Sequence, residues 1–237
     1  MLAKRDIEYT ISYFYILKFF QKYIFLILIM IISFISRKGG TGKTTNITHL
    51  ATTLASQKKR VLLIETDTNY TLTTLRKMEL FKKKELEKDA PFPILTSTDD
   101  TIIEQLEKSK KGKKYDYILI DSAGKTTDEG IRKLCLASNL VVVPTSLSQN
   151  DLLVAYQTIQ DLKPAKEINK KLKIAILPNR IHNRTNPKTV QNALSSLDAT
   201  IIPTFVVSKN KMAEFSTLNP IEEYQEIAEN IVSLLKS

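Results

Sequence analysis

The stretch whose residue types point most clearly to a chemical role reads RKGGTGKTT and occupies residues 37–45. It follows an apolar run and precedes a helical pattern, which is the context that a phosphate-binding loop requires. Three glycines would let the backbone curl so that several N–H groups face phosphate oxygens: Gly39, Gly40 and Gly42. Lys43 would reach the β- and γ-phosphates, and the Thr44 hydroxyl would bind Mg²⁺. We therefore expect a nucleoside triphosphate here.

A second motif supplies a candidate metal ligand. The run KYDYILID is apolar between acidic residues and ends at Asp121. Placed at the end of a strand beside the phosphate loop, Asp121 would hold Mg²⁺ through water, because this cation prefers hard oxygen ligands. Asp116, at the start of the run, is expected to serve in a turn or strand entry.

Composition narrows the remaining chemistry. The 237 residues include a single cysteine, Cys135, and two histidines, His49 and His182. A disulfide framework or a multi-cysteine cluster is excluded, and a zinc enzyme or Ser-His-Asp hydrolase is disfavoured. The net charge of +10 favours an anionic partner such as nucleic acid or an acidic membrane surface. A soluble protein with scattered surface lysines is the alternative.

Apolar runs and helical patterns alternate from Met30 onward, which predicts an α/β fold. The sheet would be doubly wound and mainly parallel, with helices on both faces, as in P-loop NTPases. We expect buried strands at 31–36, 61–66, 94–98, 117–121, 140–144, 174–178 and 200–203. Helices are expected at 44–57, 101–110, 128–137, 151–170, 187–197 and 220–235. Ligands of such sheets bind at the carboxyl ends of the strands.

The beginning of the chain differs from the rest. Residues 11–36 are aromatic and apolar, yet the uninterrupted part is shorter than the roughly 20 residues that span a membrane. Met30 is a natural start for the domain, directly on its first strand. We therefore expect residues 1–29 to be an extension outside the fold or an upstream-start artefact, and 30–237 to form one ATPase domain. A membrane anchor is the rival interpretation, so a membrane is a disfavoured but open partner.

The form KGGTGKTT resembles the deviant Walker A motif of the ParA/MinD family of ATPases. The resemblance rests on three motifs in order and covers roughly residues 30–237. It implies that ATP and Mg²⁺ are bound and that the loop residues Thr41 and Thr45 take part. It also implies a homodimer that encloses nucleotide between its subunits. Lys38 matches the lysine that, in this family, crosses to the nucleotide of the second subunit.

The same resemblance assigns a catalytic role to Asp67, which matches the family's aspartate that positions the attacking water and lies near Mg²⁺. A helix N-cap for a helix from Thr71 is the alternative. Several residues depart from the family pattern and leave the hydrolysis rate open: Glu65, Thr68, Asn69, Ser122, Ala123 and Gly124. With Lys38 and Lys43, Asp67 completes the expected catalytic set.

The segment ILPNRIHNRTNP resembles the part of the family that reads the base. Asn179 would hydrogen-bond the adenine edge, because an amide offers both a donor and an acceptor. Arg180 would contact the base region, and Pro203 would add backbone contacts. These residues extend the expected cofactor site beyond the phosphate loop.

The resemblance is closest to short ParA-type partition ATPases, which implies slow ATP hydrolysis to ADP and phosphate. An ATP dimer would bind nucleoid DNA without sequence preference in the cytoplasm, and a ParB-like centromere-binding adaptor would stimulate hydrolysis for plasmid or chromosome segregation. Candidate DNA contacts are Arg180, Arg184, Lys188, Lys209 and Lys211. A MinD-like membrane-positioning ATPase and a nucleotide switch with little hydrolysis remain as alternatives.

Overall fold

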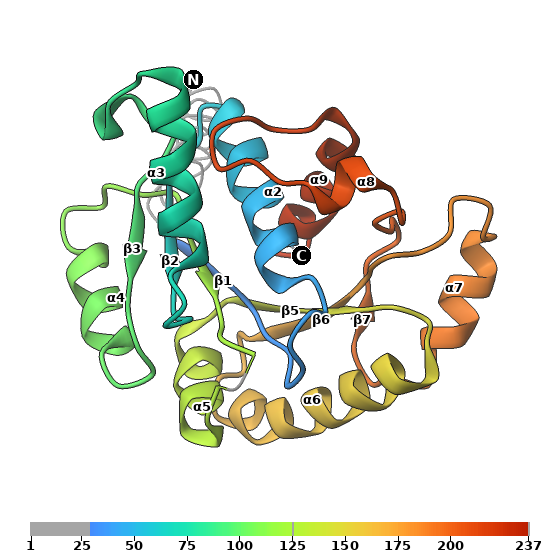
Figure 1. Ribbon diagram of the computed structural model, residues 1–237. Coiled ribbons are helices and arrows are strands. Elements are labelled where there is room, and N and C mark those ends of the chain that lie inside the picture. The colour runs from blue at the N-terminus through green and yellow to red at the C-terminus, as the bar shows by residue number, and fades with distance from the viewer. Residues whose placement is uncertain (1–28, 125, 237) are drawn as a thin grey trace, which may run out of the picture.

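The sheet of this protein is entirely parallel. The computed structural model describes residues 29–124 and 126–236, whose strands form a seven-stranded sheet in the order β3-β2-β4-β1-β5-β6-β7 (Figure 1). The strands are β1 (Met30–Phe34), β2 (Val61–Glu65), β3 (Ile94–Thr96), β4 (Tyr117–Asp121), β5 (Leu140–Thr145), β6 (Lys173–Pro178) and β7 (Thr200–Ile201). Their near-continuous apolar composition suits burial on both faces, so the predicted fold class is confirmed.

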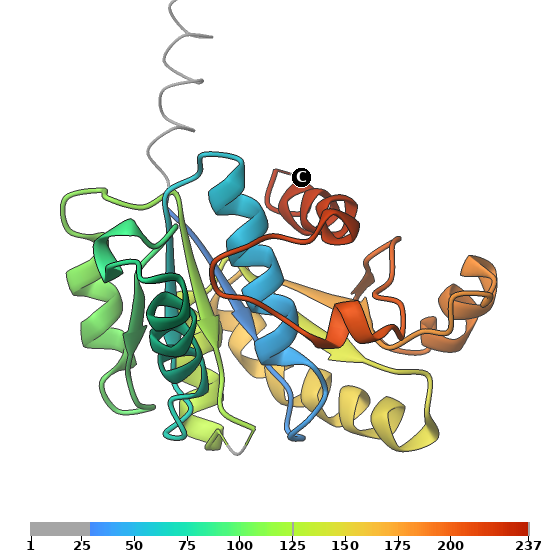
Figure 2. The same ribbon diagram turned by 45° about the horizontal axis from the view of Figure 1, so that its top comes forward.

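Helices cover both faces of this sheet (Figures 1 and 2). One core packs α2 (Lys43–Ser56), α3 (Thr71–Lys83), α8 (Asn210–Ala213) and α9 (Gln225–Ser233) on one face. The other core packs α4 (Ile102–Lys110), α5 (Asp128–Ala137), α6 (Gln149–Ile168) and α7 (Pro187–Leu194). Side chains alternate between the two cores along each strand: in β1, Ile31 faces the second core and Ile32 the first.

Helix α8 was absent from the sequence-based expectations, and α3 entered them only through the alternative in which Asp67 caps a helix from Thr71. Helix α3 buries only Leu72, Arg76 and Leu80, one residue per turn, so its apolar pattern is sparse. Helix α8 has four residues, too few for a periodic signal. The expected terminal helix is split, because a 3₁₀ turn at Glu222–Tyr224 precedes α9.

The structure tests only part of what the sequence predicts for the N-terminal region. Residues 30–34 form β1 in the middle of the sheet, so the membrane-anchor interpretation is wrong for this part of residues 11–36. Residues 11–28 of the predicted anchor, and residues 1–28 of the predicted extension, lie outside the described residues. Among residues 29–124 and 126–236, no helix is long and apolar enough to cross a membrane.

Candidate nucleotide-binding site

The glycine-rich loop joins the carboxyl end of β1 to the first turn of α2. Gly40 and Gly42 have φ values of 75° and 96°, which side chains other than glycine rarely adopt. A Cβ on Gly42 would also lie 2.3 Å from Asn179 Nδ2. Helix α2 has no side-chain cap and no acidic residue in its first turn, so its N–H groups are left for an external anion. The loop therefore has the geometry of a phosphate cradle.

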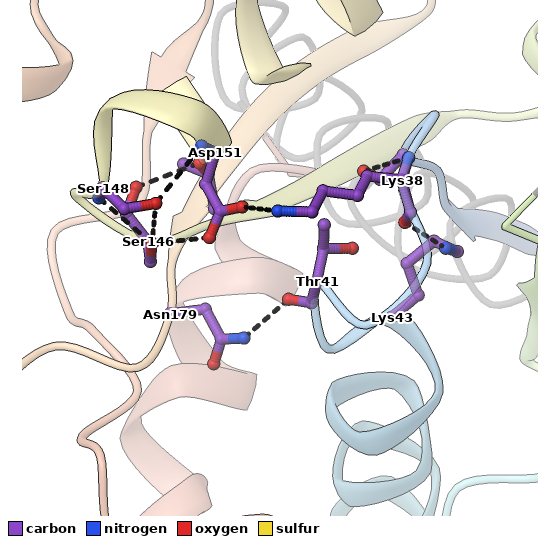
Figure 3. Close-up of polar contacts among 9 residues, drawn as sticks. Lys38, Thr41, Lys43, Ser146, Ser148, Asp151 and Asn179 are labelled. Carbon is purple, nitrogen blue, oxygen red and sulfur yellow. Dashed lines mark hydrogen bonds and ion pairs between the residues drawn. The ribbon is translucent and has the colours of Figure 1, made fainter. Parts of the chain in front are cut away.

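Two lysines of this loop point in different directions (Figure 3). Lys43 is buried, and its Nζ donates to the Lys38 carbonyl at 3.3 Å, inside the loop. Burial lowers the Lys43 pKa, while the neighbouring Asp121 and Asp67 oppose this change. Lys38 instead extends away from the loop to α6, where its Nζ contacts Asp151 Oδ1 at 2.7 Å.

Asp151 is fixed by more than this lysine. Its Oδ2 accepts a hydrogen bond from Ser146 Oγ at 2.6 Å, and its backbone N–H donates to Ser148, the N-cap of α6. Lys38 is the largest cause that lowers the Asp151 pKa, followed by Ser146. The sequence had not singled out Asp151, because an acid three residues after a helix-capping serine looks like an ordinary first-turn residue.

Arg37 anchors the beginning of the same loop. Its guanidinium pairs with Asp161 of α6 and with Asp128 at the start of α5, both at 2.6 Å. These carboxylates raise the Arg37 pKa. The position that carries glycine in the usual Walker form thus holds a side chain that ties the loop to two helices.

Asp121 has the environment of a metal ligand. Its side chain is 1% exposed, and its Oδ1 has no hydrogen-bond partner among the described residues. Burial raises the pKa of this carboxyl to about 7, while a hydrogen bond from Thr44 and the charge of Lys43 lower it. A buried, unpartnered oxygen beside a threonine hydroxyl fits Mg²⁺, which takes hard oxygen ligands. Thr44 and Asp121 would hold the ion.

Asp67 lies beside the loop, in an open cleft formed by the segments that follow β2, β3 and β4. The cleft is lined by Gly39, Thr66, Asp67, Thr68, Asn69, Thr98, Asp99, Asp100, Ala123 and Gly124. The segment after Asp121 closes tightly on the loop, since a Cβ on Gly124 would lie 3.1 Å from Gly39 Cα. The departures from the family pattern at 68–69 and 123–124 therefore gather around one cleft.

The alternative role of Asp67 as a helix cap is wrong. Helix α3 has Tyr70 at its N-cap, and Asp67 Oδ1 instead accepts the N–H of Asn69 at 3.0 Å. Glu65 takes the capping role from within the core: its fully buried carboxylate accepts the N–H groups of Leu72 and Thr73 at 2.8 and 3.3 Å. Glu65, which is one methylene longer than the aspartate more usual at this position, thus has a structural role, because it satisfies backbone donors in the first turn of α3.

A cavity lies next to the loop, where the sequence predicts the base. It is lined by Gly42, Thr45, Asn46, Asn179, Arg180, Val206, Val207, Ser208, Lys209, Asn210, Met212 and Ala213. Asn179 is 4% exposed, and its Nδ2 donates to the Thr41 carbonyl at 2.8 Å, so this amide also clamps the phosphate loop (Figure 3). Arg180 has φ of 55° and an exposed side chain. Pro203 is exposed and does not line the cavity.

Residues 206–213 form a wall of this cavity that the sequence did not suggest. They lie in a loop and a four-residue helix, where periodicity carries no signal. His49 of α2 holds this wall in place, because its Nε2 is 3.1 Å from the Met212 carbonyl. Burial lowers the pKa of His49, which favours the neutral ring.

The candidate DNA contacts all have exposed side chains, in α7, α8 and the loops after β6 and before α8: Arg180, Arg184, Lys188, Lys209 and Lys211. Two of them, Arg180 and Lys209, also line the cavity. Lys211 pairs with Glu223 at 2.8 Å, which makes it the weakest candidate for a phosphate contact. The other four have no ion-pair partner within the described part of the chain.

A parallel sheet with this loop and a buried carboxylate at its carboxyl edge is the architecture of the P-loop ATPases of the ParA/MinD type. The model of the VirC1 protein family matches residues 29–224, and the chain belongs to this family. Two relatives support the assignment. Protein virC1 from Rhizobium radiobacter is 30% identical over 128 residues, covering 54% of this chain and only 54% of that relative. Maintenance of carboxysome distribution protein A from Halothiobacillus neapolitanus is 26% identical over 170 residues, 71% and 75% of the two chains.

Solved structures agree in fold. A plasmid partition protein from Borrelia burgdorferi bound to AMPPNP has a TM-score of 0.65 at 20% identity, covering 88% of this chain and 99% of that one. MinD from Aquifex aeolicus has a TM-score of 0.66 at 21% identity, covering 88% and 98%. The structure of pNOB8 ParA bound to nonspecific DNA has a TM-score of 0.59 at 17% identity, covering 88% and 99%.

Proposed function

We propose that this protein is an ATP-driven partition switch: it binds Mg-ATP, dimerises around the nucleotide, binds DNA without sequence preference and is released by hydrolysis. The observation that carries the proposal is the convergence of Lys43, Thr44 and the unpartnered Asp121 oxygen at the phosphate loop. Similar proteins are named for the maintenance of carboxysome distribution and for plasmid partition, which supports a positioning task.

In the proposed reaction, water attacks the γ-phosphate in line with the leaving ADP oxygen. Lys43 neutralises charge that spreads over the transferred phosphoryl group, and Asp67 orients the water. Mg²⁺, when held by Thr44 and Asp121, supplies further charge neutralisation. The partner's copy of Lys38 would add a cation from outside, as an arginine finger does.

The position of Lys38 supports its action in trans. Its side chain is 42% exposed and leaves its own loop, so it can swing from Asp151 to a second subunit without disturbing the phosphate cradle. Lys38→Ala should therefore spare Mg-ATP binding and abolish the ATP-dependent dimer. Lys77→Ala, which removes an exposed α3 lysine, is the matched control. Sedimentation with ATP and with ADP measures the dimer in both variants. An ATP-dependent dimer of Lys38→Ala would contradict the proposed action of Lys38 in trans.

The DNA step is tested by salt titration of DNA binding with ATP, with ADP and without nucleotide. Binding that needs ATP and weakens as salt rises is expected, because phosphate contacts release counterions. Removing Arg184 and Lys188 together should lower the salt slope by roughly two, about one per phosphate contact. An unchanged slope refutes these contacts, while ATP-independent DNA binding refutes the switch.

The MinD-like alternative depends on a terminal amphipathic helix that is free to bind lipid. Here α9 buries Ile227, Ala228 and Ile231 in the core. Withdrawing these side chains would expose core surface, so the partition function is the better-supported proposal.

A further inference from the structure

Arg37 and Lys38 are neighbours in the sequence, but their side chains contact α6 at points that are far apart. Arg37 Nε donates to Asp161 Oδ2 at 2.6 Å, near the middle of the helix. Lys38 Nζ donates to Asp151 Oδ1 at 2.7 Å, in the first turn (Figure 3). The two aspartates are separated by about 15 Å of helix, at about 1.5 Å per residue. The two side chains therefore diverge along α6.

Arg37 is held by both its side chain and its backbone. Besides Asp161, its guanidinium pairs with Asp128 at the start of α5, where Nη2 lies 2.6 Å from Oδ1. Its backbone N–H donates to the Oγ1 of Thr158 in α6 at 3.3 Å, and Thr158 is fully buried. An arginine suits this position because its planar group presents several donors in a fixed fork, so that it can pair with two carboxylates at once.

The two helices that hold Arg37 are themselves fixed. Helix α6 buries Ala155, Ile159 and Leu162 in the core. The start of α5 has a second support, because the N–H and the Oγ1 of Thr127 both donate to Asp99 Oδ2 at 3.1 Å. Arg37 thus ties the backbone immediately before Lys38 to points that are anchored independently of the loop.

Lys38, in contrast, has one ionic contact that it can leave. In the described part of the chain, Asp151 is the one hydrogen-bond partner of its ammonium group, and the side chain is 42% exposed. A half-exposed ion pair of this kind contributes little to stability. The Lys38 side chain can therefore exchange partners while the contacts of Arg37 keep its backbone in place.

The phosphate cradle has supports of its own. Asn179 Nδ2 donates to the Thr41 carbonyl and Asn46 Nδ2 to the Gly42 carbonyl, both at 2.8 Å. Neither contact involves Arg37. Removing the Arg37 guanidinium should therefore loosen the start of the loop and leave the part that faces the phosphates in place.

We propose that Arg37 is a positioning residue for Lys38. It fixes the backbone from which Lys38 reaches the nucleotide of a second subunit, and it acts through Lys38 rather than on the nucleotide. The inference rests on the proposed function, in which Lys38 acts in trans. Lysine carries its charge on a flexible four-carbon stem, so a displaced backbone would displace the ammonium group as well. A misplacement of about 1 Å can cost about a hundredfold in rate.

The test compares Arg37→Gln with the matched control Arg60→Gln in the full chain. Arg60 also pairs with a carboxylate at 2.6 Å, that of Asp116, but it directly precedes β2, at the end of the parallel strands away from the loop. Both variants remove one partly exposed guanidinium and its ion pairs. Arg37→Gln should lower ATP turnover and the ATP-dependent dimer by roughly tenfold or more, and Arg60→Gln should change neither.

Two further measurements separate positioning from a general structural role. The affinity of Arg37→Gln for Mg-ADP, measured by calorimetry, should stay close to that of the wild type, because ADP tests the cradle without the dimer. Arg37→Lys should recover only part of the turnover, because an ammonium group lacks the fork that pairs with two carboxylates.

Turnover and dimerisation in Arg37→Gln equal to those of Arg60→Gln would overturn the inference and leave the proposed function intact. A parallel loss of Mg-ADP affinity would also overturn it, because Arg37 would then support the cradle rather than Lys38. If the wild type itself neither hydrolyses ATP nor dimerises with it, the proposed function fails, and the inference fails with it.

Discussion

Replacing Asp121 with asparagine should stabilise the nucleotide-free protein at neutral and alkaline pH. Burial raises the pKa of this carboxyl from 3.8 to about 7, so the charged form is disfavoured in the folded chain. At about 1.4 kcal/mol per pKa unit, this corresponds to roughly 4 kcal/mol as an upper bound. Lys43 loses an anionic neighbour in the variant, which offsets part of the gain. We therefore expect a net stabilisation of about 1–3 kcal/mol at pH 8.

The raised pKa of Asp121 also determines how the stability difference between the variant and the wild type changes with pH. Below pH 3.8 the carboxyl is protonated in both states, so it costs the wild type nothing. Between 3.8 and about 7 the folded state holds the proton that the unfolded state releases, and wild-type stability falls as pH rises. The advantage of Asp121→Asn should thus grow from near zero at the acid end to a plateau above pH 7.

Urea unfolding of wild type and variant across this range, without nucleotide, measures the difference. A parallel titration with Mg-ATP should show that the variant loses the magnesium-dependent part of nucleotide affinity. A stability difference that is constant with pH, or a variant less stable than wild type at pH 8, would refute the argument that desolvation dominates at Asp121.

Three further outcomes are expected. Asp151→Asn should raise the ATP-dependent dimer up to about fivefold, because it releases a half-exposed ion pair with Lys38 worth at most about 1 kcal/mol; sedimentation with ATP measures it, and a weaker dimer counts against the idea. Arg76→Met should lower the free energy of unfolding by about 3 kcal/mol or more. The Arg76 side chain is 1% exposed, and its removal leaves three buried hydrogen-bond acceptors without a partner. A urea midpoint close to that of the wild type would contradict this. Gly130→Ala should lower the Tm, because a Cβ there would lie 2.4 Å from Asp99 Oδ2; an unchanged Tm would mean that Asp99 moves freely.

Local sequence patterns were sufficient for most of the sheet. Parallel strands buried on both faces are short continuous apolar runs. Such runs place β4 at its observed bounds and the other six strands within two residues of theirs. The phosphate loop could also be predicted from the sequence, because its glycines and Lys43 lie in one contiguous motif. Helix α8 was missed because it has a single turn, and α3 was considered only as a helix that Asp67 would cap, because its apolar face is sparse.

The partners of charged side chains were decided by the tertiary structure. Asp151 lies 113 residues from Lys38 in the sequence, and nothing local indicates that they meet. The same holds for residues 206–213, which line the cavity beside the phosphate loop although they are far from that loop in the sequence. Spacing in the sequence encodes contacts within one loop or helix. Contacts between loops depend on strand order, which the fold determines only once both cores are packed.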